Sequence, residues 1–260
     1  MGCNRRSEKE RVTALQRYFL EKSFDENEMN SITGDDSKHI TRVMRMGVGD
    51  KIIAVINGDA YISSIIELLT DSVAIRREGD PLPANEMPIH VTIACGLPKG
   101  DKLDLIVQKG TELGMKAVIP FKAERSVVKW DDKKSVKKIE RLSKIAKEAA
   151  EQCHRTIIPT IEEPCNLVQL LQLVKNYDVL LFADEEYAKS DEPNRIADRL
   201  KDMCPEQTVL VVFGPEGGIS RTEADAFRAA GFLSISLGPR ILRTETAPIY
   251  LLSAMSCEFE

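Results

Sequence analysis

From residue 88 to the C-terminus, short apolar runs alternate with segments of helical pattern, and this alternation restricts the fold more than any other feature. Strands are expected at 89–95, 117–121, 157–161, 179–183, 208–213 and 233–237, and helices at 101–113, 133–153, 167–175, 193–202, 221–230 and 246–259. Strands that alternate with helices build mainly parallel sheets. The sequence therefore predicts an α/β domain with a mainly parallel sheet over 88–260.

The segment 15–85 has a different pattern, in which short apolar runs are separated by polar turns. Asn57-Gly58 between two such runs is a strong hairpin signal. Several short strands at this spacing favour a small β-barrel, followed by a linker. We expect strands at 16–20, 51–56, 60–67 and 72–77, a short amphipathic helix at 39–46, and a linker at 79–85. Residues 1–14 carry charge without hydrophobic period, and we expect a disordered or artefactual extension there.

Composition excludes several classes of protein. No apolar run approaches the roughly 20 residues that span a bilayer, and the charged N-terminus does not resemble a secretory signal, so no membrane partner is expected. The six cysteines form no CxxC pair, which disfavours a metal site and favours free thiols in a reducing cytoplasm. A net charge of −5 does not suggest a nucleic-acid binder, although a local basic surface can still bind RNA.

The first candidate site is the loop Gly214-Pro215-Glu216-Gly217-Gly218, which directly follows the expected strand 208–213. Ligands of α/β sheets bind outside the carboxyl ends of the strands, and glycines let the backbone approach them closely. A tight turn without a ligand is the alternative. The loop matches neither a phosphate-binding Walker A motif nor a dinucleotide fingerprint.

A second loop, residues 237–247, follows the last expected strand and enters the last helix. Thr244 could cap that helix, and Glu245 could complement its dipole. Neither role explains Arg240 and Arg243. A loop with this load of charged side chains is more typical of a binding site than of a simple turn.

Together the two loops resemble the ribosomal RNA small subunit methyltransferase E (RsmE) family of the SPOUT superfamily. Further stretches that resemble it are 39–46, 98–102, 108–114, 124–128 and 151–155. The resemblance covers residues 15–260. Leu15 stands where the family's initiator methionine would be, so we expect residues 1–14 to precede the start.

The resemblance implies a PUA-like RNA-binding β-barrel at 15–85 and a SPOUT methyltransferase domain with a trefoil knot at 88–260. It implies S-adenosylmethionine as cofactor and a homodimer, which the apolar helix 246–259 also favours. The implied reaction is methylation of uridine N3 in the decoding region of 16S small-subunit ribosomal RNA, either free or in the assembled subunit.

Backbone-rich loops suit a cofactor that carries an adenine and a sulfonium, because such a group needs shape and hydrogen bonds rather than a phosphate cradle. The cofactor is expected at Phe182, Ala183, Gly214, Gly218, Leu237, Gly238 and Leu242. The uridine N3 proton must be removed, or the developing anion stabilised. Arg243 and Arg155 are candidates for stabilising that charge or for gripping phosphate, and Glu216 and Glu245 are candidate bases that could instead order a loop.

A basic stretch at 122–147 is the expected RNA contact, because phosphate contacts supply most non-specific affinity. A solvated helix face is the alternative. The expected RNA-binding residues are Arg125, Lys134, Lys137 and Lys138, with Arg17, Arg42 and Arg45 in the first domain.

Two other functions stay open at this point. One is a SPOUT enzyme that methylates a ribose 2′-hydroxyl of another RNA. The other is a non-catalytic RNA-binding protein of ribosome assembly, which would not need an intact cofactor loop. A nucleotide-hydrolysing enzyme would need a phosphate loop that this sequence does not contain.

Overall fold

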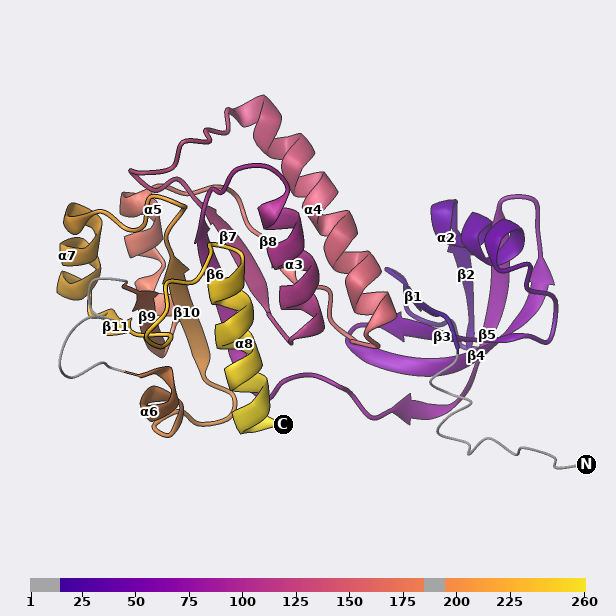
Figure 1. Cartoon of the computed structure of the whole chain (residues 1–260). Coiled ribbons are helices and arrows are strands. Elements are labelled where there is room, and N and C mark those ends of the chain that lie inside the picture. The colour runs from indigo at the N-terminus through magenta and orange to yellow at the C-terminus, as the bar shows by residue number, and fades with distance from the viewer. Residues whose placement is uncertain (1–14, 185–194) are drawn as a thin grey trace, which may run out of the picture. The chain divides into compact units, whose positions relative to one another are not determined.

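The computed structural model describes residues 15–184 and 195–260 (Figure 1). The expected extension 1–14 and the first residues of the expected helix 193–202 lie outside this part of the chain. The chain divides into two compact units. The first comprises the described part of Met1–Glu86 together with Ala150–Ile157, and the second comprises Met87–Ala149 and Ile158–Glu260.

The first unit is built on a five-stranded sheet with the order β1-β3-β4-β5-β2. Its only parallel pair within the described chain is β1 with β3, and the other neighbours are antiparallel. Asn57 and Gly58 both have positive φ, so the predicted hairpin turn is confirmed. The strands are β1 (Arg17–Phe19), β2 (Met29–Thr33), β3 (Lys51–Ile56), β4 (Asp59–Leu68) and β5 (Ser72–Leu82).

In three details this unit differs from what the sequence pattern predicted. Strand β2 was not expected, because only Ile32 in it is fully buried and the strand is recognisable only through its pairing with β5. The helix begins earlier than expected, as α2 (Gly34–Lys38), and continues as the π-helix η1 (His39–Val43). Strand β5 runs through Leu82 into the expected linker, because a register shift opposite Ala60 accommodates Gly79 at φ 69°.

The second unit contains the predicted parallel sheet, with six strands in the order β11-β9-β10-β6-β7-β8. Every neighbouring pair runs parallel. Strands β8 and β11 are shorter than expected. The strands are β6 (His90–Gly96), β7 (Ala117–Phe121), β8 (Thr160–Ile161), β9 (Val179–Ala183), β10 (Thr208–Phe213) and β11 (Leu233–Ile235).

Helices follow the strands in the predicted alternation. They are α3 (Lys102–Glu112), α4 (Asp132–Gln152), α5 (Leu167–Gln172) with the 3₁₀ turn η2 (Val174–Asn176), α6 (Ile196–Leu200), α7 (Arg221–Ala229) and α8 (Thr246–Phe259). Ser220 and Glu223 form a capping box at the start of α7. Asp101 occupies the N-cap of α3, without a side-chain capping hydrogen bond. Glu245 rather than Thr244 occupies the N-cap of α8, so the role considered for Thr244 as the cap of that helix is wrong.

Strand β10 shows how the sheet is covered on both faces. Val209, Val211 and Phe213 belong to one core cluster, which includes side chains of α3, α4, α6 and α8. Leu210 and Val212 belong to a second cluster with side chains of α5 and α7. Because alternate residues of a strand point to opposite faces, the second unit has three layers, helix–sheet–helix. The chain threading that a trefoil knot requires stays a prediction.

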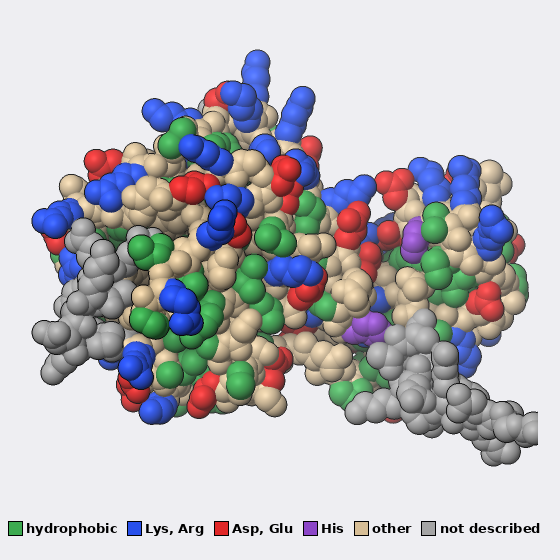
Figure 2. Space-filling view, in the orientation of Figure 1, with side chains coloured by type: hydrophobic (Ala, Val, Ile, Leu, Met, Phe, Trp, Pro, Cys, Tyr) green, Lys and Arg blue, Asp and Glu red, His purple; other side chains and the backbone are tan. Residues whose placement is uncertain are grey.

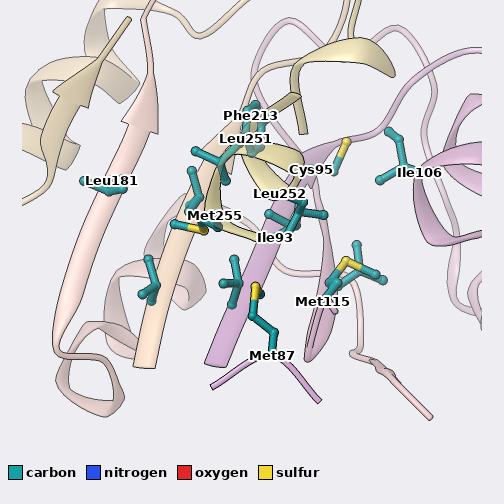
Figure 3. Packing of buried hydrophobic residues seen from close by; sticks show 14 of the residues in the cluster. Met87, Ile93, Cys95, Ile106, Met115, Leu181, Phe213, Leu251, Leu252 and Met255 are labelled. Atoms are coloured by element: carbon teal, nitrogen blue, oxygen red, sulfur yellow. The ribbon is translucent and has the colours of Figure 1, made fainter. Parts of the chain in front are cut away.

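Helix α8 closes the first of these clusters. Leu251, Leu252 and Met255 are fully buried there with Ile93 and Phe213 of the sheet (Figure 3). This helix follows directly from the loop that ends at Glu245, so its packing fixes where that loop leaves the sheet. Along the described ranges, no helix is both long and apolar enough to cross a membrane.

We predict that Leu252→Ala lowers the free energy of unfolding by about 2–5 kcal/mol, because it removes a fully buried side chain and leaves a cavity. Val136→Ala is the control, since Val136 is 54% exposed on α4 and should change stability by less than about 0.5 kcal/mol. Urea denaturation followed by circular dichroism measures both. Equal effects of the two substitutions would contradict the described packing of α8.

Candidate active site

The carboxyl ends of β9, β10 and β11 meet at one edge of the parallel sheet, as neighbouring parallel strands must. The two loops singled out in the sequence follow β10 and β11 and line a cavity of about 790 Å³ at this edge. The cavity lies within the size range of small-molecule and cofactor sites. The predicted cofactor residues that line it are Ala183, Gly214, Gly218, Leu237, Gly238 and Leu242.

Phe182 is the predicted cofactor residue that does not line the cavity. Its side chain is fully buried in the second core cluster, with its ring 5.7 Å from that of Phe227. The guanidinium of Arg228 lies 5.5 Å from the Phe182 ring centroid, and Arg228 itself lines the cavity. Phe182 therefore supports the wall of the cavity from behind.

Backbone packing explains the glycines of the first loop. A Cβ atom on Gly214 would lie 2.7 Å from the backbone carbon of Gly218 and the nitrogen of Ile219, which leaves no room for a side chain. Gly218 has φ 70°, and its N–H donates to the carbonyl of Pro215 at 2.8 Å. Both features hold the loop folded back on itself with its backbone along the cavity.

Side chains from other elements tie this loop in place. The Glu223 carboxylate accepts hydrogen bonds from the backbone N–H of Glu124 at 2.8 Å and of Ser220 at 2.9 Å. Arg125 donates to the carbonyl oxygens of Gly217 at 3.1 Å and Ile219 at 3.4 Å. Arg125, a predicted RNA contact, therefore lines the cavity and braces its loop.

An ion cluster stands at the edge of the cavity. Lys102 Nζ lies 2.7 Å from Glu216 Oε1 and 3.5 Å from Glu245 Oε2, and the backbone N–H of Lys99 donates to Glu216 at 3.1 Å. The hydrogen bond to Glu216 raises the pKa of Lys102. Burial alone would raise the pKa of Glu216, but the hydrogen bonds from Lys102 and from backbone N–H groups hold it below its ordinary value. Both groups are therefore charged at neutral pH.

Glu245, the other candidate base, is placed differently from Glu216. Its side chain is 17% exposed, is not part of the cavity lining and contacts the site through Lys102. Its Oε2 atom is buried and accepts no hydrogen bond from the residues that the structure describes. Glu216 lines the cavity, whereas Glu245 lies behind Lys102.

Arg240 and Arg243 line the cavity from the second loop. Both are exposed. Neither side chain forms a hydrogen bond or an ion pair with any residue in 15–184 or 195–260. Two guanidinium groups thus present unused donors to whatever occupies the cavity.

Known proteins with the same architecture place this site in a family. A protein-family model described as the RNA methyltransferase domain matches residues 85–256. A second family model, described as the RNA methyltransferase PUA domain, matches residues 32–75. The ribosomal RNA small subunit methyltransferase E of Bacillus subtilis is 44% identical over 253 residues, which is 95% of this chain and 98% of that protein. The chain belongs to the ribosomal RNA small subunit methyltransferase E family.

Solved structures agree with this family assignment. The methyltransferase E of Neisseria gonorrhoeae, bound to S-adenosyl methionine, is 25% identical with a TM-score of 0.81, over 94% of this chain and 97% of that one. A crystal structure described only as a hypothetical protein is 43% identical with a TM-score of 0.87, over 94% of this chain and 99% of that one. The methyltransferase E family therefore accounts for both units of the chain.

The structure gives Arg155 a partner that the sequence did not suggest. Its Nε and Nη2 atoms donate to Glu86 Oε2 at 2.9 and 2.6 Å, and Glu86 Oε1 accepts the backbone N–H groups of Thr156 and Ile157. The Arg155 side chain is 4% exposed and does not line the cavity. Arg17 is also buried and donates to the carbonyl of Arg155 at 2.9 Å. Both arginines have structural partners within the first unit.

The remaining predicted RNA contacts lie at the surface. Arg42, Arg45, Lys134 and Lys137 are exposed, and Lys138 is half-buried. Lys102 is the site residue that sequence reasoning missed. The stretch 98–102 was noted as similar to the methyltransferase E family, but no local signal links Lys102 to a glutamate 114 residues later.

We predict that Gly218→Val weakens binding of S-adenosylmethionine at least about tenfold, because a side chain would enter the cavity from a backbone with positive φ. Gly231→Val is a matched control, since Gly231 also has positive φ and open space but lies outside the cavity lining. Calorimetry measures affinity, and thermal melting measures the shared folding cost. Normal affinity in Gly218→Val would remove this loop from the cofactor site.

Proposed function

We propose that this protein transfers the methyl group of S-adenosylmethionine to N3 of a uridine in the decoding region of 16S small-subunit ribosomal RNA. One observation carries the proposal: the two loops of the methyltransferase E family meet around a single cavity that presents unpaired arginines. The relative from Bacillus subtilis is named for small-subunit ribosomal RNA, and the relative from Neisseria gonorrhoeae was solved with the cofactor.

The cavity fits such a cofactor in its chemistry as well as in its volume. Two glycine-bearing loops form much of its lining, and their backbone groups can hydrogen-bond an adenine and a ribose, while Leu237 and Leu242 add apolar surface. When bound, the cofactor supplies an electrophilic methyl group on a sulfonium. In the described ranges, no group of three or more His, Cys, Asp or Glu side chains could hold a metal ion.

The acceptor nitrogen sets the chemical problem. Uridine N3 carries a proton, which must leave as the new N–C bond forms and the S–C bond breaks. Cations beside the uracil oxygens make that loss easier, because they stabilise the negative charge that develops there. We propose Arg243 for this role because its guanidinium lines the cavity unpaired, and Lys102 because its charged ammonium lies at the cavity edge.

The carboxylates suit positioning better than proton transfer. Glu216 has a lowered pKa and is paired with Lys102, so it is a weak base at neutral pH. We propose that Glu216 and Glu245 hold Lys102 toward the cavity, and that the N3 proton leaves to water once the uracil oxygens are stabilised. Arg155 is then assigned to folding of the first unit through its pair with Glu86.

Several further points of the proposal rest on the family resemblance. We propose that the first unit and the exposed lysines of α4 hold the RNA backbone, that the protein is a cytoplasmic homodimer and that its second unit is knotted. The domain limits 15–85 and 88–260 belong to the same proposal.

The reaction is tested by incubating the protein with methyl-labelled cofactor and either free 16S ribosomal RNA or assembled small subunits. Digestion to nucleosides and mass spectrometry should reveal 3-methyluridine. Labelled 2′-O-methyluridine instead would move the assignment to ribose methylation, and cofactor binding without any methylation would favour a binding protein.

We predict that Arg243→Ala lowers the single-turnover rate about 10²-fold at saturating RNA, because it removes a charge that stabilises the transition state. The rate should rise with pH as N3 loses its proton, and this rise should move to higher pH in the variant. The Lys102–Glu216 pair does not titrate near neutrality, because the pKa of Lys102 is raised and that of Glu216 is lowered.

The matched control for Arg243→Ala is the triple substitution of Lys134, Lys137 and Lys138 by alanine. It should weaken RNA binding. The slope of log affinity against log salt concentration should fall in magnitude by roughly 0.7–0.9 per lost phosphate contact, and the maximal rate should be nearly unchanged. If Arg243→Ala behaves in the same way, Arg243 is a phosphate clamp rather than a catalytic residue.

A further inference from the structure

A second, smaller cavity of about 300 Å³ lies in the same unit as the first. Its walls come from the loop between β6 and α3, from the start of α3, from the segment that leads into α4, and from α4 itself. The residues that line it include Gly100, Asp101, Asp104, Lys129, Trp130 and Lys138. Its volume is at the lower end of the range for small-ligand pockets, which suits a single nucleobase.

The two cavities are lined by neighbouring residues at the junction of the β6–α3 loop and α3. Lys102 lines the first cavity, whereas its neighbours Gly100 and Asp101 line the second. The backbone N–H of Lys99, in the same loop, donates to Glu216 at the edge of the first cavity. A chain of nucleotides that placed one base in the first cavity would therefore bring an adjacent nucleotide to the second.

The second cavity contains the chain's sole tryptophan, Trp130. Trp130 is half-buried, and it packs against the core cluster that includes α3 and α4. A ring held in place by the core and open on its other side can stack on a base of any sequence. Base stacking on an aromatic side chain typically changes affinity by about 5-fold to 150-fold.

Charge around the cavity favours a phosphate. The acidic residues Asp101 and Asp104 are both ion-paired with Arg141, which offsets their charge. Lys134 pairs with Asp131 at 3.1 Å. Lys129 and Lys138 have no carboxylate within ion-pair distance among residues 15–184 and 195–260. Figure 2 shows Lys and Arg side chains gathered around the N-terminal end of α4, at the top of the view.

We infer that the second cavity binds a nucleotide adjacent to the target uridine in single-stranded RNA. The base stacks on Trp130, and its phosphate contacts Lys129 and Lys138. This inference rests on the proposed function, because it assigns the cavity to the same RNA. It adds a subsite that would extrude and grip a neighbouring base while the target base occupies the first cavity.

Because Trp130 is the only tryptophan, its fluorescence reports on this cavity alone. A single-stranded RNA oligonucleotide that spans the methylated uridine should quench the emission on titration. Replacing one flanking nucleotide at a time by an abasic residue should identify one position at which quenching is lost and affinity falls about 5-fold to 150-fold. Quenching by a free mononucleotide as tight as by the oligonucleotide would overturn the inference.

Variants separate stacking from a structural role. Trp130→Phe should keep RNA affinity within a few-fold, and Trp130→Leu should lose about as much affinity as the critical abasic substitution. In Trp130→Leu, the abasic substitution should lower RNA affinity no further. If it lowers RNA affinity as much in Trp130→Leu as in the unaltered protein, Trp130 only packs against the core. Cofactor affinity and melting temperature serve as checks that each variant is folded.

The lysines are tested by the salt dependence of binding. The double change Lys129→Ala and Lys138→Ala should lower the log–log slope by about 0.7 for each lost contact to single-stranded RNA. Lys175→Ala, an exposed lysine outside both cavities, should leave the slope unchanged. Equal slopes in all three proteins would overturn the phosphate contact. Methylation of the RNA by the unaltered protein is scored separately, so failure of the proposed reaction and failure of this subsite give different results.

Discussion

The close packing of β10 against its neighbours determines where everything else in the second unit lies. This strand is paired on both edges, with β9 and β6, and its side chains are buried on both faces. At its carboxyl end the chain turns so tightly that a Cβ on Gly214 would clash with the backbone at Gly218. A Cβ on Gly96, at the end of β6, would lie 2.5 Å from Pro215. Backbone contact between these two strand ends sets the shape of the cavity wall.

The same edge of the sheet concentrates positive charge in an acidic protein. The chain carries a net charge of −5, yet Lys102, Arg125, Arg240 and Arg243 all line one cavity. The glutamate in this lining, Glu216, is held by Lys102 rather than left free to repel an anion. Net charge therefore says little about the partner, because the distribution of charge around the site decides what can bind there.

The loop between β6 and α3 connects the two cavities, so it links the proposed site of methyl transfer to the proposed binding site for the neighbouring nucleotide. In this loop the Lys99 N–H donates to Glu216 at the edge of the first cavity, and Gly100 and Asp101 line the second cavity. Lys102, which follows at the start of α3, lines the first cavity. A nucleotide bound at Trp130 would thus lie against the same segment of chain that leads into Lys102. Such shared support is one way in which a protein aligns a substrate with its reacting groups.

The sequence by itself determined the features that depend on neighbours along the chain. Short apolar runs that alternate with helical patterns predicted the parallel α/β unit, Asn57-Gly58 predicted the hairpin, and the glycine loop after β10 indicated the binding edge. The tertiary structure decided which distant groups meet. In the folded chain, Lys102 pairs with Glu216, and Phe182 is buried beneath the guanidinium of Arg228. Arg155 donates hydrogen bonds to Glu86, which lies 69 residues earlier in the chain. Local periodicity indicates which face of a helix or strand is buried. Which residues pack against that face depends on how the crossover connections order the strands in the sheet. That order is a property of the folded chain alone.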